Sequence, residues 1–255
     1  MTTKKQNLIS IENLTLAYDG RVVVRDINFT VNRGDIFVIM GMSGCGKSTI
    51  MRSMIGLAKP VRGRIVVDGI DIWATDDNTR AGIIGNFGIS YQGGALFSSM
   101  TVRENVALPL VLKQELGQRE IDKRVDTILR QVGLGGYENL YPNEISGGMI
   151  KRTALARALV MEPSVLFFDE PSAGLDPVRA AELDNLIRDI NHKTGTTVVM
   201  VTHELPTIMT IANNSVYIDA ATQTVGAAGA PKHILKTTKN HGIIEFLTRN
   251  ETYRG

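Results

Sequence analysis

Three short apolar runs without polar interruptions stand out along the chain, at residues 36–40, 165–168 and 198–201. Each run is too short for a typical helix, and none shows the alternation of a strand with one exposed face. Continuous runs of this length are typical of central strands that are buried on both faces of a parallel α/β sheet. A weaker run at residues 88–91 is predicted to join them. The pattern therefore predicts a mostly parallel central sheet.

The remaining pattern predicts an antiparallel part and a helical part. Apolar and polar residues alternate through the N-terminal segment, which indicates antiparallel strands with a turn at Asp19 and Gly20. Helical periodicity dominates residues 102–134 and predicts an inserted, mostly helical subdomain. An amphipathic helix is expected over residues 177–193, with Pro177 in its first turn. A short strand pair followed by a tail is expected after residue 214.

A chain of 255 residues suits one α/β domain with an inserted subdomain. We expect a single domain over residues 1–250, with a core at residues 1–92 and 160–230, a helical subdomain at 93–159 and a C-terminal tail at 231–255. No signal-peptide pattern is evident at the start. The apolar runs are far shorter than the ~20 residues that a membrane-spanning helix needs. A protein of this sequence that acts at a membrane would need another chain to supply the membrane part.

Polar residues follow each of the predicted central strands. They are Gly41 with a glycine-rich segment, Gln92, the pair Asp169 and Glu170, and the pair Thr202 and His203. In open parallel sheets, ligands bind beyond the carboxyl ends of the strands. We therefore expect these residues to form one site.

The segment GMSGCGKST at residues 41–49 fits the pattern G-x-x-x-x-G-K-[ST] of a phosphate-binding loop. Glycines let main-chain N–H groups turn inward around an anion, and the following helix adds the positive end of its dipole. The lysine of such a loop reaches the β- and γ-phosphates of a nucleotide, and the serine hydroxyl binds Mg²⁺. The predicted phosphate-binding residues are Gly41, Ser43, Gly44, Cys45, Gly46, Lys47, Ser48 and Thr49.

Asp169 and Glu170 supply a second part of the predicted site. Asp169 at a strand end can hold the Mg²⁺ shell, and Glu170 is placed to orient or deprotonate an attacking water. An apolar run that ends in Asp-Glu could equally be a solvated strand end. The phosphate loop earlier in the chain favours the functional interpretation.

Ser146, Gly147 and Gly148 precede a segment with helical character, IKRTALARALVME. A serine and two glycines before a helix expose N–H donors and a hydroxyl, which suits an anion. The same residues could form an ordinary helix cap.

Charge and cysteine content exclude little. Lys and Arg number 28 against 26 Asp and Glu, a formal net charge of +2, so the balance does not favour a nucleic-acid partner. With Cys45 as its one cysteine, the chain forms no internal disulfide.

Six segments resemble, in order, the motifs of the ABC (ATP-binding cassette) transporter ATPase subunits. They are GMSGCGKST, ISYQ, ISGGM, VLFFDE, SAGLD and VTHE. The resemblance covers about residues 8–230 and implies the P-loop fold of ABC type and hydrolysis of ATP with Mg²⁺. It implies that Gln92 lies near Mg²⁺ and the attacking water, together with Ser48 and Asp169, and that His203 touches the γ-phosphate.

The resemblance also implies a head-to-tail homodimer. Ser146, Gly147 and Gly148 resemble the signature motif, which contacts the γ-phosphate bound to the partner subunit, and Asp176 resembles the D-loop aspartate between subunits. Tyr18 matches the aromatic residue that stacks on adenine. Without the resemblance, Gln92, Asp176 and His203 would pass for surface residues and Tyr18 for a strand-end aromatic. Met149 stands where the signature usually has Gln, and this departure leaves the hydrogen-bond donors intact.

Residues 92–110, residues 146–157 and the segment Glu245-Phe246-Leu247 resemble a narrower branch, the Mla or Mkl ATPases. That resemblance implies phospholipid transport between bacterial membranes. The implied partners are integral membrane permease subunits, an MCE-domain protein and a small accessory subunit. It further implies a place at the cytoplasmic face of the inner membrane. Two alternatives stay open: the ATPase of an importer for small solutes, and a soluble ABC ATPase of a scaffold or assembly system.

Overall fold

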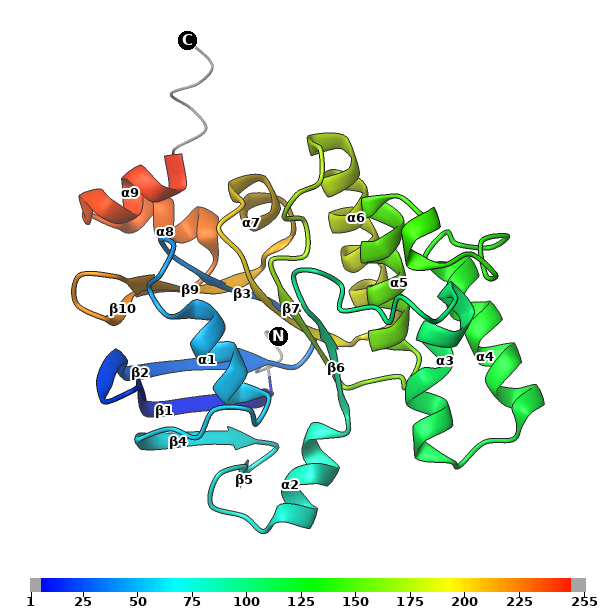
Figure 1. Cartoon of the computed structure of the whole chain (residues 1–255). Coiled ribbons are helices and arrows are strands. Elements are labelled where there is room, and N and C mark those ends of the chain that lie inside the picture. The colour runs from blue at the N-terminus through cyan, green and yellow to red at the C-terminus, as the bar shows by residue number, and fades with distance from the viewer. Residues whose placement is uncertain (1–5, 249–255) are drawn as a thin grey trace.

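The computed structural model describes residues 6–248, which form two sheets and a layer of helices (Figure 1). The smaller sheet is antiparallel. It has the order β2-β1-β4-β5, formed by β1 (Asn7–Tyr18), β2 (Arg21–Asn32), β4 (Arg62–Val67) and β5 (Ile70–Asp71). Asp19 and Gly20 connect β1 to β2 with positive φ angles of 47° and 76°. The predicted antiparallel strands and their turn are confirmed.

The larger sheet has the order β10-β9-β3-β8-β7-β6. Its neighbours are parallel except for β10, which pairs with β9 in the antiparallel sense. The strands are β3 (Ile36–Met40), β6 (Phe87–Ser90), β7 (Val165–Asp169), β8 (Thr197–Val201), β9 (Asn214–Asp219) and β10 (Thr224–Ala228). The apolar runs therefore form the mostly parallel central sheet that they predict.

Each central strand packs against two apolar cores at once. On β3, Phe37 and Ile39 belong to the core shared with the smaller sheet, whereas Val38 and Met40 belong to the core shared with the helices. Side chains of a strand alternate between its faces, so a strand covered on both sides needs apolar residues at every position. This is the physical reason for the uninterrupted runs.

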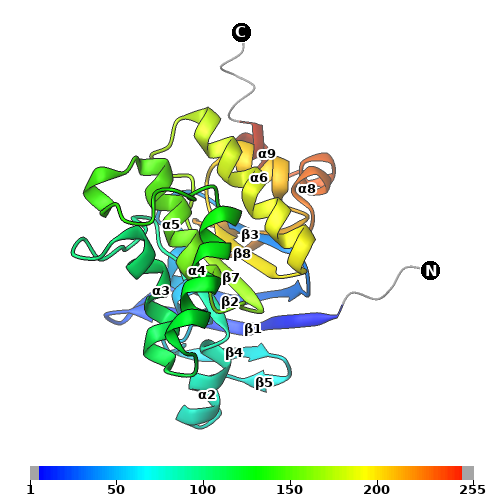
Figure 2. The same cartoon turned by 90° about the vertical axis from the view of Figure 1, so that its right-hand side faces the viewer.

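The helical segment lies at one end of the sheet (Figure 2). It contains α3 (Val102–Lys113), α4 (Gln118–Gln131), the short helix η1 (Pro142–Glu144) and α5 (Gly147–Leu159). On α4, the buried residues Ile121, Val125 and Leu129 recur every fourth position. They belong to the same apolar cluster as α5 and the helix-covered face of the larger sheet. The helical part is therefore continuous with the main core.

Four further helices lie before residue 212; the first two pack into the core shared with the smaller sheet, and the last two into the helix-covered core. They are α1 (Lys47–Met54), α2 (Asp77–Ile84), α6 (Pro177–Thr194) and α7 (Leu205–Ile211). The helix expected after Pro177 is confirmed as α6, which ends at Gly195 in the left-handed region, with φ of 70°. Across residues 6–248, no helix has both the length and the apolar character needed to cross a membrane.

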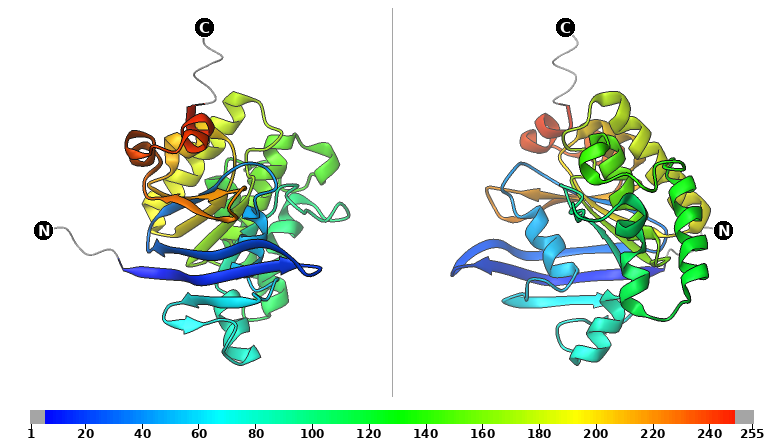
Figure 3. Two further views of the ribbon diagram at one scale, coloured as in Figure 1. Left: turned by 90° about the vertical axis from the view of Figure 1, so that its left-hand side faces the viewer. Right: turned by 45° about the vertical axis from the view of Figure 1, so that its right-hand side comes forward.

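The described part of the expected C-terminal tail is helical. Residues after β10 form α8 (Pro231–Thr237) and α9 (His241–Thr248), which lie beyond β9 and β10 (Figure 3). Ile243, Phe246 and Leu247 of α9 are buried, and the Phe246 ring meets Tyr217 of β9 edge-on with 5.4 Å between centroids. An apolar face held on the core makes this segment a packed helix. Residues 249–255 lie outside the described part.

Candidate active site

The phosphate loop follows β3, whose five residues are all buried, and leads into α1. Gly41 and Gly46 have φ angles of 150° and 99°. A Cβ at Gly41 would lie 2.5 Å from the Ile218 carbonyl oxygen, and one at Gly46 would lie 2.7 Å from Val24 Cγ1. Only glycine fits both positions, because other residues would meet strained backbone and occupied space.

Lys47 begins α1 and folds back over the loop. Its Nζ donates to the carbonyl oxygens of Gly41 and Met42, both at 3.0 Å, and its side chain is buried. The residue before it, Gly46, caps the helix without a side-chain hydrogen bond. The first-turn N–H groups of α1 and the Lys47 ammonium therefore face the same loop, a donor set that suits a phosphate.

Ser48 and Asp169 connect the phosphate loop to β7. Ser48 Oγ donates to Asp169 Oδ1 at 2.9 Å, although the two residues are 121 positions apart in the chain. Among the described residues, no group of three or more His, Cys, Asp or Glu side chains could hold a metal ion. A hydroxyl and one carboxylate beside a phosphate loop suit Mg²⁺, which prefers few protein ligands together with phosphate oxygens and water.

Glu170 follows β7 and is held on both carboxylate oxygens. Oε1 lies 2.7 Å from His203 Nδ1, and Oε2 accepts a hydrogen bond from Thr202 Oγ1 at 3.0 Å. Its backbone N–H donates to the Val201 carbonyl at 2.8 Å, and its φ of 49° lies in the left-handed region. A non-glycine residue in that region is strained, and such strain concentrates at functional sites. Two neighbouring strand ends thus fix one carboxylate.

One cavity of about 350 Å³ brings these residues together. It lies at the carboxyl ends of β3, β6, β7 and β8, where the strand order predicts it. The predicted residues that line it are Ser43, Gly44, Gly46, Lys47, Ser48, Thr49, Gln92, Asp169, Glu170 and His203. Val23 of β2 also lines it.

Residues 24–173 match a family model described as ABC transporter, which covers more than half of the 255 residues. The chain belongs to the ABC transporter family. Among solved structures, the cassette cbiO1 of Clostridium perfringens, part of the transporter complex cbiONQ, matches with a TM-score of 0.83 and 29% identity over 98% of each chain. The cassette MJ0796, solved as a dimer bound to ADP and phosphate, matches with a TM-score of 0.77 and 29% identity over 88% of this chain and 98% of that chain. The fold is that of an ABC ATPase cassette.

Curated relatives belong to different transport systems. The probable ribonucleotide transport ATP-binding protein mkl of Mycobacterium tuberculosis is 42% identical over 81% of this chain and 57% of its own length. The intermembrane phospholipid transport ATP-binding protein MlaF of Haemophilus influenzae is 35% identical over 95% of this chain and 90% of its own. The methionine import protein MetN 1 of Staphylococcus aureus is 40% identical over 89% and 67%. The chain thus spans little more than half the length of the mkl relative and nearly all of MlaF.

The residues predicted to form the ABC signature lie apart from the phosphate-loop cavity. Ser146 caps α5 and accepts a hydrogen bond from the Met149 N–H at 3.4 Å. Ser146 and Gly148 line a separate cavity of about 150 Å³ between α5 and α6. Asp176 caps α6, where Oδ1 accepts from the N–H groups of Val178 and Arg179, both at 3.1 Å. Within the described chain, the phosphate loop and the signature are therefore two separate places.

Three other predicted residues do not line the phosphate-loop cavity. Tyr18, at the end of β1, is 75% exposed. Cys45 is buried, its Sγ faces Gly41, and burial raises the pKa of its thiol. Cys45 can therefore offer the site its backbone only. Gly41 contributes the turn and the carbonyl that Lys47 binds.

Sequence reasoning did not assign roles to Thr202, Lys151 and Arg157. Thr202 binds Glu170, and its place before His203 at a strand end was the available signal. Lys151 of α5 donates to the Gln92 carbonyl, and Arg157 donates to the carbonyls of Gly94 and Ala95 at 2.7 and 2.8 Å. Burial lowers the pKa of the Lys151 ammonium. Helix α5 thus holds the segment after β6. The two are about 60 residues apart in the chain, so no local sequence pattern predicts the contact.

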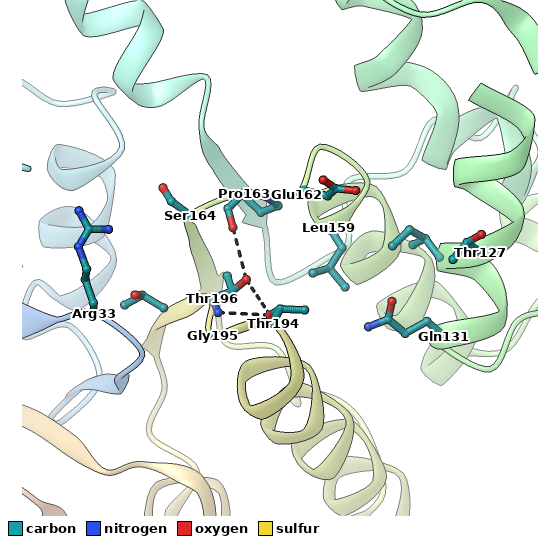
Figure 4. A pocket seen from close by; sticks show the side chains of 12 residues that line it. Arg33, Thr127, Gln131, Leu159, Glu162, Pro163, Ser164, Thr194, Gly195 and Thr196 are labelled. Carbon is teal, nitrogen blue, oxygen red and sulfur yellow. Dashed lines mark hydrogen bonds between the residues drawn. The ribbon is translucent and has the colours of Figure 1, made fainter. Parts of the chain in front are cut away.

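A cavity of about 600 Å³ lies at the amino-terminal ends of β7 and β8, opposite the ends that carry the phosphate-loop cavity (Figure 4). It is bounded by α4, by the segment before β7 and by the turn before β8, where Thr194 and Thr196 bond to each other at 2.8 Å. Threonines and apolar side chains dominate its lining, and Arg33 at its edge is paired with Asp68. This cavity is separate from that of the phosphate loop, Asp169 and Glu170, which lie at the carboxyl ends of the strands.

Proposed function

We propose that this protein is the ATP-hydrolysing subunit of an ABC transporter. The observation that carries the proposal is the single cavity in which the Lys47 loop, the Ser48–Asp169 pair and the Glu170–His203 pair converge. The family match and the cassette neighbours support ATP as the substrate. Composition gives no reason to expect a nucleic-acid partner.

In this proposal the phosphate loop binds the triphosphate through its main-chain N–H groups and Lys47. Ser48, Asp169 and Gln92 would hold Mg²⁺, which supplies charge neutralisation of the phosphates when bound. Glu170 orients and deprotonates the attacking water, and His203 contacts the γ-phosphate. The hydrogen bonds from Thr202 and His203 fix the Glu170 carboxylate before substrate arrives, which favours catalysis because little reorganisation is then needed.

We propose that the signature residues act in trans, in a head-to-tail homodimer. Ser146, Gly147, Gly148 and Asp176 would then reach the nucleotide of the second copy, and Tyr18 would stack on adenine from the exposed end of β1. The separation of the signature from the phosphate-loop cavity supports this, as does the dimeric form of the similar MJ0796 cassette. A monomer is expected to hydrolyse ATP poorly.

We further propose phospholipid transport between bacterial membranes, at the cytoplasmic face of the inner membrane. The partners would be permease subunits, an MCE-domain protein and a small accessory subunit. The support is the likeness to the phospholipid transport protein MlaF, together with a groove of about 280 Å³ on α3 and α4. Met100, Ala107, Leu108 and Val111 give that groove an apolar floor suited to a permease helix. The second candidate is a small-solute importer, which the likeness to MetN 1 favours.

Glu170→Gln tests the hydrolytic assignment. The amide keeps the size of the side chain but has one acceptor oxygen in place of two and cannot act as a base, so turnover should fall by about 10²–10⁴-fold. ATP binding should persist, because the phosphate loop is unchanged. Steady-state ATPase rates and equilibrium binding of labelled ATP measure the two effects. Robust turnover by this variant would show that another group activates the water.

Mass spectrometry of the intact membrane complex tests the proposed cargo. Co-purification of an MCE-domain protein together with phospholipid is the expected result. A complex that instead contains a solute-binding protein and no MCE-domain protein would favour the importer. A chain that associates with no membrane protein in any detergent would favour a soluble scaffold ATPase.

A further inference from the structure

A cavity of about 230 Å³ lies behind the proposed hydrolytic residues. Its walls are the segment after Glu170, the first half of α6, and α7 with the residue before it. Both carboxylates in the lining, Asp184 and Glu204, face it, and its lining in the described chain includes no Lys, Arg or His. Two carboxylates therefore share a cavity whose remaining lining is largely apolar.

Asp184 is a buried carboxylate that the proposed mechanism does not use. Its side chain is 4% exposed, and Oδ2 accepts a hydrogen bond from Thr207 Oγ1 at 2.7 Å. Asp184 Oδ1 and Ser172 Oγ both lack a hydrogen-bond partner among the described residues, and Ser172 is only 3% exposed. Both residues line this cavity. Buried polar atoms without partners are uncommon, because each loses its hydration, so two in one cavity call for an explanation.

The position of these groups connects them to the active site. Ser172 follows Glu170 by two residues, in a turn where the Ala173 N–H donates to the Glu170 carbonyl at 3.2 Å. Thr207 follows His203 by four residues and lies on α7. Helix α7, which begins two residues after His203, therefore reaches Asp184 through Thr207, and the segment that follows Glu170 lines the same cavity.

We propose that Asp184 is a positioning residue for ATP hydrolysis, which ties α7 to α6 through the hydrogen bond from Thr207 and so holds in place the two segments that follow His203 and Glu170. This inference rests on the proposed roles of Glu170 and His203. The contact of 2.7 Å between Glu170 Oε1 and His203 Nδ1 depends on how the segments that carry these two residues are placed relative to each other. Displacing reacting groups by about 1 Å can cost about 10²-fold in rate.

The charges around Asp184 agree with a buried, hydrogen-bonded group. Burial is the main cause that raises the pKa of the Asp184 carboxyl; the Thr207 hydroxyl lowers it, Glu204 raises it and Arg188 lowers it. An asparagine at this position can still accept the hydrogen bond from Thr207. Asp184→Asn is therefore the conservative variant, and Asp184→Leu and Thr207→Val are the disruptive ones.

The experiment measures kcat and KM for ATP in the full chain assembled with its membrane partners. Thr207→Val and Asp184→Leu should lower kcat about tenfold or more, on the scale that misplaced catalytic groups produce, with KM little changed. Asp184→Asn should retain most of the wild-type kcat. Asp189→Asn, an exposed carboxylate on the same helix, is the matched control and should behave as wild type.

Wild-type kcat in Thr207→Val and Asp184→Leu, measured per folded molecule, would overturn the inference. If Asp184→Leu does not fold, Thr207→Val and Asp184→Asn decide the question. Glu170→Gln is measured in parallel. If that variant keeps its turnover, the hydrolytic assignment fails; if it is inactive while Thr207→Val is normal, only the role of Asp184 fails.

Discussion

The N-termini of α1 and α5 both follow small residues, but their glycines serve different surroundings. At Gly46 a Cβ would collide with Val24, and the left-handed backbone itself demands glycine. At Gly147 a Cβ would meet no described atom within 4 Å, and at Gly148 only Arg179 Cδ at 3.6 Å. The described chain alone therefore explains glycine at the start of α1 and does not explain it at the start of α5.

This difference indicates where each half of the proposed site is completed. In the phosphate loop, Gly41, Cys45 and Lys47 are buried. Lys47 binds a loop carbonyl and Ser48 binds Asp169, both within a single chain. Ser146 and Gly147 are exposed and Gly148 is partly exposed. Glycine at these positions is explained if a neighbour must come close to the backbone. A second copy whose nucleotide approaches Gly147 and Gly148 would supply that neighbour, as the head-to-tail proposal requires.

Lys47→Ala should have the largest effect on this comparison, because it removes the buried ammonium of the self-contained half. We expect ATP affinity to fall by about 10²-fold or more, as loss of a charge-assisted contact with phosphate would produce. Lys59→Ala, an exposed lysine close after α1, is the control. Equilibrium binding of labelled ATP measures both. Unchanged affinity in Lys47→Ala would refute the phosphate-loop assignment.

Gly46→Ala and Gly147→Ala place the same methyl group at the two helix starts. Gly46→Ala should lower the melting temperature and abolish ATP binding, because the added Cβ has no space. Gly147→Ala should leave the melting temperature and monomer ATP affinity unchanged but lower the ATPase rate by about 10-fold or more, if a partner's phosphate must approach within contact distance. Thermal unfolding, ATP binding and turnover separate the two outcomes. A Gly147→Ala protein with normal turnover would break the comparison.

Thr202→Val tests how the buried half holds its carboxylate. Valine keeps the shape of threonine but removes the hydroxyl that donates to Glu170 Oε2. Turnover should fall about tenfold, since one fixed hydrogen bond to a charged group contributes roughly 1.5–3 kcal/mol. The KM for ATP should stay near the wild-type value. A rise in KM as large as the fall in turnover would indicate that the variant binds ATP poorly as well.

The larger part of the fold follows from local pattern. Residues 36–40 and 198–201 predicted their strands because both faces of each strand are covered, and the loop at residues 41–49 carries its own signal. Helix α9 gave no such signal, since it is eight residues long and is held by Phe246 against Tyr217. Helix α7 is likewise short, with seven residues.

The site residues that could be predicted from the sequence are those that directly follow a strand of the parallel sheet. The polar residues after β3, β6, β7 and β8 share one cavity because parallel strands end together. The contacts of Asp184 with Thr207 and of Lys151 with Gln92 depend on tertiary packing, so no spacing in the sequence announces them. Which residues approach the second copy also depends on geometry between chains.

The smallest predicted effect concerns pH and the buried carboxylate. Burial raises the folded-state pKa of Asp184, so its protonated form favours folding, and that contribution is lost as pH rises through the raised pKa. Asp184→Asn cannot ionise. The melting temperature of Asp184→Asn minus that of wild type should therefore increase by about 2–4 °C from acidic to mildly alkaline pH. The exposed Asp189→Asn should show no such trend in thermal unfolding scans. A wild-type advantage that grows with pH would contradict the assignment.

The central claim is that the phosphate loop of one copy and the signature residues of a second copy close over ATP between them. The most direct measurement is the molar mass of Glu170→Gln by light scattering, with and without Mg-ATP. We predict a monomer mass without nucleotide, a doubled mass with Mg-ATP, and a monomer mass under both conditions when Gly147→Ala is added. A Glu170→Gln chain that binds Mg-ATP and stays monomeric, both alone and with its membrane partners, would contradict the account.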